Sequence, residues 1–128
     1  MKTIYNFILE KLTLSNQSKL KPLKWTIETA ERGDIITINK GSIKLIFIFK
    51  EVDKEDDDKI KSIAAINVHT ALHRIYLLYN PQNQTDYFFT KHDAKFSLAT
   101  EREKQLLFDK LKEKGYKWNA KKKEIEKI

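Results

Sequence analysis

Three histidines are the first residues in this sequence whose chemistry could be catalytic or metal-binding. His69 and His73 lie four positions apart, a spacing that places both side chains on one face of either a helix or a strand, and His92 could join them in space. Imidazoles are common zinc ligands, but the residues between His69 and His73 lack the glutamate that a helix-borne zinc hydrolase motif requires. We therefore expect no metal site, and a metal-dependent enzyme is only a third functional hypothesis.

A run of carboxylates is the second candidate, because oxygen ligands of this kind bind calcium. It consists of Asp53, Glu55, Asp56, Asp57 and Asp58. An EF-hand loop needs alternating ligands, a glycine at its sixth position and a glutamate at its twelfth, whereas Asp58 and Ala64 occupy those positions here. We interpret residues 51–58 as an exposed loop between two strands and expect no calcium site.

The third candidate is a cluster of lysines beside a tryptophan near the C-terminus. It comprises Lys117, Trp118, Lys121, Lys122 and Lys123, with Tyr116 before them. An exposed indole could stack on a base while the lysines hold phosphates, so the cluster predicts a nucleic-acid-binding face. Glu124 and Glu126 dilute its charge. The competing interpretation is that Trp118 fills the gap between a terminal hairpin and the helix before it, which would remove the stacking surface.

Other catalytic motifs are missing from the sequence. Its three glycines form no phosphate-binding loop, no serine has the glycine neighbours of a nucleophile elbow, and there is no cysteine. We therefore expect a protein that is not an enzyme and needs no cofactor. The lack of cysteine also fits a reducing compartment, which favours a cytoplasmic location.

The charge balance is the one compositional feature that indicates a partner. The formal net charge is +7 and the isoelectric point is about 9.5, values that favour association with nucleic acid or anionic surfaces. However, only Arg32, Arg74 and Arg102 are arginines, and arginine is the residue preferred for reading bases and clamping phosphates. Because the sequence also lacks any catalytic motif, our first hypothesis is a non-enzymatic interaction module with a protein partner, and nucleic-acid binding is the alternative.

The elements that position these candidates fit one domain, because 128 residues suffice for a single hydrophobic core. In residues 1–24, Ile4, Phe7, Ile8 and Leu12 have helical spacing, so a short helix followed by a loop is expected, with a strand as the alternative. No apolar stretch approaches the length that spans a bilayer, and residues 1–14 do not resemble a signal peptide. We expect no membrane association.

Residues 25–91 are predicted to form an antiparallel β-meander. After a turn at residues 28–32 that ends at Gly33, the expected strands are residues 35–38, 43–49, 60–68, 72–79 and 87–89, with a turn at residues 39–41. The second of these strands is apolar on both faces, which is typical of a central strand in a covered or closed sheet. The fold class is therefore α+β, with about five strands in an open meander or a small barrel.

The C-terminal third predicts one helix and a hairpin. Thr100 and Glu103 form a capping box at the start of a helix in residues 99–115, which has an apolar stripe at Leu106, Leu107, Phe108 and Leu111. Gly115 ends this helix. Residues 116–128 are expected to form a hairpin anchored by Trp118, Ile125 and Ile128.

Two stretches resemble small hypothetical proteins that phages and mobile elements of gut bacteria carry. The first is Trp25-Thr26-Ile27 with Ala30 and Gly33-Asp34 after it, a "WTI..A..GD" pattern. The second runs from Ala99 to Glu124 and follows the pattern "ATE....LLF.K.KE.GY.W...KKE". The resemblance covers the chain from Trp25 onward and implies a setting and a domain plan without a chemistry. It also implies a virion-associated location as the alternative to the cytoplasm.

Overall fold

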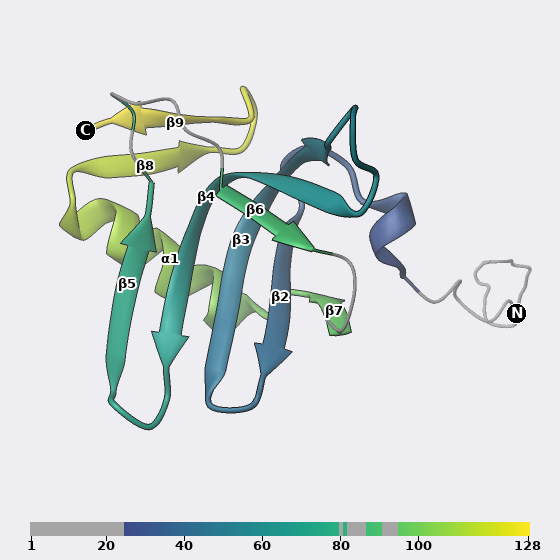
Figure 1. Cartoon of the computed structure of the whole chain (residues 1–128). Helices are drawn as coiled ribbons and strands as arrows, with labels where there is room; N and C mark the ends of the chain where they lie inside the picture. The colour runs from purple at the N-terminus through teal and green to yellow at the C-terminus, as the bar shows by residue number, and fades with distance from the viewer. Residues whose placement is uncertain (1–24, 80, 82–86, 91–94) are drawn as a thin grey trace, which may run out of the picture.

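The computed structural model of the chain describes residues 25–79, 81, 87–90 and 95–128 (Figure 1). The helix or strand predicted within residues 1–24 and the side chain of His92 lie outside the described residues. The fold is α+β, as the sequence predicts: an antiparallel sheet, one helix and a C-terminal β-hairpin. Among the described residues, no helix has the length and apolar character needed to cross a membrane.

The main sheet contains six described strands. They are β2 (Ile35–Lys40), β3 (Ile43–Val52), β4 (Lys59–His69), β5 (Arg74–Leu78), β6 (Tyr87–Thr90) and β7 (Lys95–Leu98). Their order is β5-β4-β3-β2-β7, and β6 also pairs with β4. β5 pairs with the second half of β4 and β6 with its first half, so these two strands follow one another along the same edge.

The sheet is open, so the barrel alternative is wrong. A barrel closes only when its first and last strands pair. Here β7 forms one edge beside β2, and β5 with β6 forms the other edge beside β4; no described strand joins the two edges. The count of about five strands also missed β7, because the chain returns after β6 to the far edge of the sheet.

Two turn positions differ from the prediction. The turn between β2 and β3 lies at Gly41 and Ser42, so Asn39 remains in β2. Leu72 and His73 belong to the turn before β5 and not to a strand; Leu72 is 57% exposed, and His73 has a positive φ of 52°. Periodicity alone could not separate these residues from the apolar strand that follows them.

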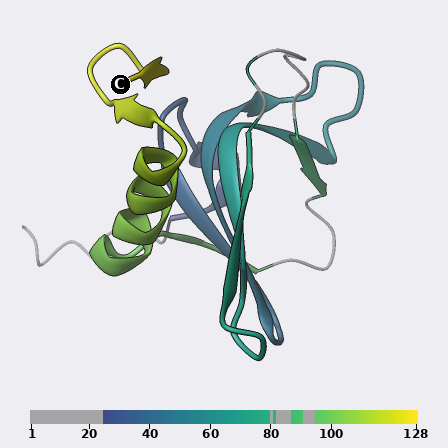
Figure 2. The same ribbon diagram turned by 90° about the vertical axis from the view of Figure 1, so that its left-hand side faces the viewer.

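β3 is apolar on both faces because both faces of the sheet are covered. Ile46 and Ile48 point toward one core, which they share with Leu107 of the helix. Phe47 and Phe49 point toward a second core on the opposite face, where the ring of Phe89 lies 4.7 Å from that of Phe47. Figure 2 shows the helix packed against one side of the sheet. The predicted central position of this strand is confirmed.

The helix α1 (Glu101–Glu113) has the predicted capping box. The Thr100 side chain accepts a hydrogen bond from the Glu103 backbone N–H at 3.1 Å, and the Glu103 carboxylate accepts one from the Thr100 N–H at 2.9 Å. Leu107 and Leu111 are fully buried against the sheet. The helix ends before Gly115, whose φ of +91° is a conformation that glycine adopts without strain.

The terminal hairpin consists of β8 (Tyr116–Asn119) and β9 (Glu124–Lys127), and a short 3₁₀ turn, η1 (Ile27–Thr29), precedes the sheet. Trp118 and Ile125 are opposite each other and pack on the first core, as predicted. The prediction that Ile128 anchors the hairpin is wrong, because this residue is 68% exposed. Its backbone N–H bonds to Gly115, a residue without a side chain to cover it.

Candidate functional site

A trough lies between α1 and the terminal hairpin. It consists of two hollows, one toward each end of α1. The lysine hollow has a volume of about 510 Å³ and is lined by Gln105, Phe108, Asp109, Lys112, Tyr116, Lys117, Trp118, Ala120 and Ile128. The loop hollow has a volume of about 540 Å³ and is lined by Gly33, Asp34, Ile35, Leu98, Ala99, Glu101, Lys104, Phe108, Trp118 and Ala120.

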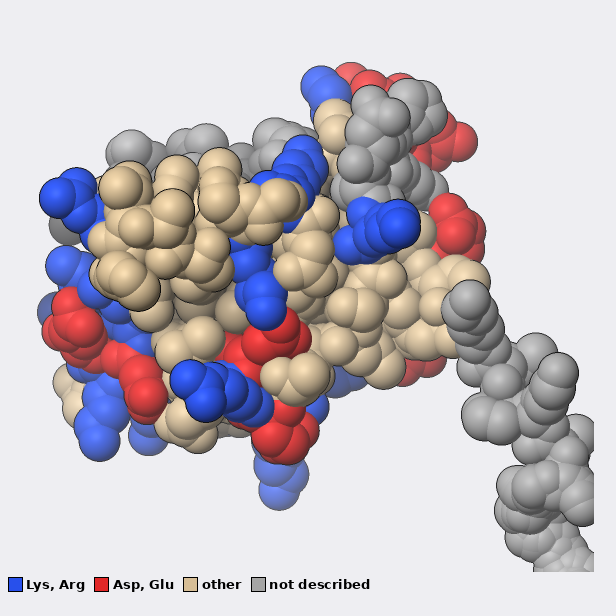
Figure 3. All heavy atoms as spheres, turned by 90° about the horizontal axis from the view of Figure 1, so that it is seen from below, with Lys and Arg blue, Asp and Glu red and all other residues tan. Residues whose placement is uncertain are grey.

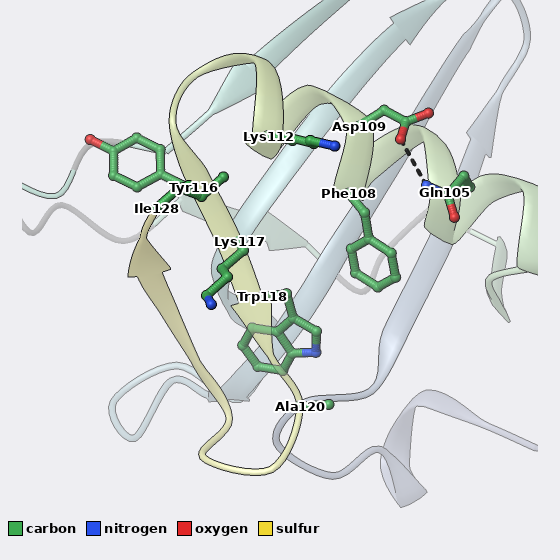
Figure 4. Close-up of a pocket in the computed structure, with 9 residues that line it drawn as sticks. All are labelled: Gln105, Phe108, Asp109, Lys112, Tyr116, Lys117, Trp118, Ala120 and Ile128. Atoms are coloured by element: carbon green, nitrogen blue, oxygen red, sulfur yellow. Dashed lines mark hydrogen bonds between the residues drawn. The ribbon is translucent and has the colours of Figure 1, made fainter.

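Phe108 and Trp118 line both hollows, and we call them the aromatic wall. Figure 4 shows the two rings close together, one from α1 and one from β8, with Lys117 projecting beside the indole. Both side chains are half-buried and pack on the first core. Trp118 therefore fills the gap between hairpin and helix, and the rest of its surface lines the trough.

A glycine lets the β2 side of the trough approach the indole. Gly33 has a φ of +97°, and a Cβ added there would lie 3.6 Å from Cζ2 of Trp118 and 3.4 Å from Cδ of Lys123. The Arg32 guanidinium also donates to the backbone carbonyl of Lys123, at 3.5 Å. These contacts tie the loop before β2 to the hairpin, although the two segments are far apart in the sequence.

The structure divides the predicted lysine cluster into two groups. Lys117 and Trp118 line the trough, whereas Lys121, Lys122 and Lys123 lie in the turn between β8 and β9 and line neither hollow. The turn forms because Asn119 Oδ1 accepts hydrogen bonds from the backbone N–H groups of Lys121 and Lys122, at 3.1 and 2.9 Å.

The lysines also differ in their ionic partners. Glu126 pairs with Lys117 at 4.0 Å and with Lys122 at 3.8 Å. Within the part of the chain that the structure describes, Lys112 of the lysine hollow has no ion pair. The two exposed pairs are weak, because solvent screens them and two long side chains lose freedom.

The charges around the trough are of both signs. The lysine hollow contains Lys112, Lys117 and Asp109, and the Asp109 carboxylate accepts a hydrogen bond from Gln105 at 2.7 Å. The loop hollow contains Asp34 together with Glu101 and Lys104, which form an ion pair at 3.0 Å. Basic and acidic side chains also alternate on the face seen in Figure 3. The trough is therefore an apolar surface with mixed charges at its rim.

A buried polar cluster near the trough was not predicted. The Glu103 carboxylate accepts hydrogen bonds from the Thr37 hydroxyl of β2, at 2.9 Å, and from the Lys44 ammonium of β3, at 2.8 Å, in addition to that from Thr100. Burial alone would raise the pKa of Glu103, but these hydrogen bonds and the charge of Lys44 together lower it. The capping box already explained Glu103 in the sequence, so nothing there signalled its contacts with the sheet.

The histidines and the acidic run form no site in the described residues. His69 is the last residue of β4, its ring 6.3 Å from that of Tyr76, while His73 lies exposed in the following turn, so they do not share one face of a strand. The loop predicted at residues 51–58 begins two residues later, because Glu51 and Val52 belong to β3, and residues 53–58 connect β3 to β4. Lys61 pairs with Asp53 at 3.9 Å. No group of three or more histidine or acidic side chains among the described residues could hold a metal ion.

Sequence reasoning placed Phe108 and Lys112 on the helix without assigning them to a site. Phe108 belongs to the apolar stripe of α1, and periodicity does not show which part of a stripe remains uncovered. Gly33 and Asp34, from the first stretch of the phage-protein resemblance, meet Trp118 from the second in this trough.

No protein-family model matches the chain, and neither does any curated protein or solved structure.

Proposed function

We propose that this protein is a non-enzymatic interaction module that holds a peptide segment of a protein partner in the trough between α1 and β8. The observation that carries the proposal is the aromatic wall, which lines both hollows. Half-buried aromatic side chains in a recess supply most of the binding free energy in many protein interfaces, because they offer a large rigid surface that a partner can dehydrate.

The charge pattern favours a peptide over a nucleic acid. A nucleic acid carries a phosphate at every step, and along the trough it would meet the carboxylates of Asp34, Glu101 and Asp109. A peptide can place an acidic residue near Lys112 and leave the rest of its length uncharged. Only two of the five predicted nucleic-acid contacts, Lys117 and Trp118, line the trough.

A displayed library of short random peptides, selected on the full-length chain, tests this function. We expect enriched peptides with an apolar or aromatic anchor. Trp118→Ala should weaken their binding about 10- to 100-fold, as loss of a central aromatic contact does in other interfaces. Lys112→Glu, on the exposed face of α1, is a second variant whose fold does not depend on the indole.

Leu72→Ala is the matched control, because Leu72 is an exposed apolar residue in the turn before β5 that lines neither hollow. Circular dichroism must show that each variant is folded. Failure to enrich any peptide would contradict the proposal. So would peptides that bind Trp118→Ala and Lys112→Glu as tightly as the unchanged chain.

Nucleic-acid binding is the competing outcome, and a titration with labelled single- and double-stranded oligonucleotides measures it. Electrostatic binding must weaken steeply as salt rises, since bound phosphates release counterions. If such binding occurs and Lys121→Glu with Lys122→Glu abolishes it, the turn is the functional surface. The phage or mobile-element setting and the cytoplasmic or virion location stay predictions.

A further inference from the structure

One edge of the terminal hairpin carries main-chain groups that have no strand partner among the described residues. In an antiparallel pair, hydrogen-bonded and non-hydrogen-bonded residue pairs alternate. The Ile128 N–H donates to the Gly115 carbonyl at 2.9 Å, which fixes the phase of this alternation. Lys117 opposite Glu126 and Asn119 opposite Glu124 are then the hydrogen-bonded pairs. The backbone N–H and C=O groups of Tyr116 and Trp118 therefore point away from β9.

This free edge borders the trough. Tyr116, Lys117 and Trp118 line the lysine hollow in succession, which shows that the hollow follows the strand (Figure 4). The ring of Tyr116 points away from Trp118 and lies edge-on to Tyr79, with ring centroids 5.1 Å apart, so it does not fill the hollow. Within the described part of the chain, β8 pairs with β9 only.

We propose that the partner segment binds in the trough as an extended strand alongside β8 and makes the hairpin three-stranded. Its main chain bonds to the free N–H and C=O groups of Tyr116 and Trp118, and every second side chain packs on the aromatic wall. This inference rests on the proposed function and specifies the conformation of the bound segment. A helix would satisfy its own backbone groups and leave those of Tyr116 and Trp118 unused.

Charge complementarity specifies the composition of the segment. The lysine hollow is lined by two ammonium groups, Lys112 and Lys117, and by one carboxylate, Asp109. Lys112 lines the lysine hollow and has no ion pair among the described residues, and Lys117 is 63% exposed with its partner carboxylate 4.0 Å away. The bound strand therefore carries an acidic residue beside Lys112 and apolar residues beside Phe108 and Trp118.

Amide hydrogen exchange, followed by NMR on the full chain, tests the arrangement of β8 before and after binding. In the free protein the amides of Tyr116 and Trp118 should exchange at least tenfold faster than those of Lys117 and Asn119, which bond to β9. The probe for the bound state is the tightest peptide from the library selection. On its addition, the Tyr116 and Trp118 amides should become protected at least tenfold, while the amides of Lys121 and Lys122 should not change.

N-methylation of that peptide, one residue at a time, gives a second readout. Methyl groups on the amides that face β8 should weaken binding at least tenfold, and those on the intervening amides should not, so the losses alternate along the peptide. Replacing its acidic residue with the neutral amide should weaken binding to the unchanged chain and leave binding to Lys112→Ala unaffected.

The outcomes separate this inference from the proposed function. The binding of a peptide could depend on Trp118 and Lys112 but leave the Tyr116 and Trp118 amides unprotected, with no alternation of the losses on N-methylation. This result overturns the strand arrangement, while the peptide-binding function stands. If no peptide binds, both are overturned. Protection of the Tyr116 and Trp118 amides could instead rise with protein concentration in the absence of peptide. That result would identify a second copy of the chain as the occupant and overturn the inference of an acidic partner segment.

Discussion

At the residue scale, Glu103 connects the helix to the sheet. Its carboxylate accepts hydrogen bonds from the N-cap residue Thr100, from Thr37 of β2 and from Lys44 of β3, and its side chain is 13% exposed. Thr37, fully buried in β2, depends on this carboxylate for its hydrogen bond. Because one side of the trough is α1, the position of Phe108 depends indirectly on this cluster.

Glu103→Ala should lower the free energy of unfolding by about 2–3 kcal/mol, since it removes the side-chain half of the capping box and leaves the buried Thr37 hydroxyl without its acceptor. Urea denaturation followed by circular dichroism measures the effect. The control is Glu101→Ala in the same turn, whose side chain is 92% exposed and should contribute less than about 1 kcal/mol. Equal losses for the two variants would show that the cluster adds nothing beyond an exposed surface charge.

The stability contribution of Glu103 should also depend on pH. Its pKa in the folded protein is lowered below the ordinary value of 4.5, so its stabilisation is fully present above that value and is lost as the pH falls through the folded pKa. The difference in unfolding free energy between the unchanged chain and Glu103→Gln should therefore shrink under acid. A difference that stays constant from neutral pH to below the folded pKa would contradict the assignment.

At the scale of elements, the trough depends on the contact between the loop before β2 and the turn after β8. Gly33 suits this contact because its positive φ is a conformation that glycine adopts without strain, and a Cβ at its position would touch Lys123 and Trp118. The predicted role of Gly33, ending a turn, is confirmed by its φ of +97°. Its second role, close approach to Trp118 and Lys123, involves residues far along the chain.

Gly33→Ala should destabilise the protein by about 1–3 kcal/mol, because alanine at a φ of +97° is strained, and it places a methyl group in contact with Lys123 and Trp118. Gly41→Ala is the matched control: its φ is +63°, but a Cβ there would meet nothing within 4 Å. We expect Gly33→Ala alone to weaken binding of a library peptide and to change the fluorescence of Trp118. Identical behaviour of the two variants in both measurements would show that the close approach is unimportant.

At the scale of the whole molecule, one sheet is shared by two cores. Ile46 and Ile48 belong to the core beneath α1, while Phe47 and Phe49 belong to the core on the opposite face. The chain has two tryptophans, and they report on different faces: Trp118 packs on the first core and Trp25 on the second. Because adjacent residues of β3 join the cores, neither face can lose its packing while the other keeps an intact sheet.

Unfolding should therefore be a single cooperative transition, as is usual for a chain of this size. In Trp118→Phe, where Trp25 is the only tryptophan, and in Trp25→Phe, where Trp118 is, the urea midpoint from fluorescence should coincide with that from circular dichroism. A Trp25 transition at lower urea than the circular dichroism transition would contradict this coupling and show that the second core opens alone.

Features that depend on neighbours along the chain could be predicted from the order of the residues alone. The capping box of α1, the ends of turns at Gly33 and Gly115, and the two apolar faces of β3 follow from local hydrogen bonding, backbone freedom and side-chain alternation, and the structure has all of them. The α+β class follows from the order of these local patterns.

Features that depend on residues distant in sequence became visible only in the folded structure. It placed β7 at the edge of β2, left the sheet open, and brought Phe108, Trp118 and Gly33 together at the trough. It also separated Lys117 from the lysines of the turn. Periodicity shows which residues avoid water, but the packing of elements shows which of them remain partly uncovered.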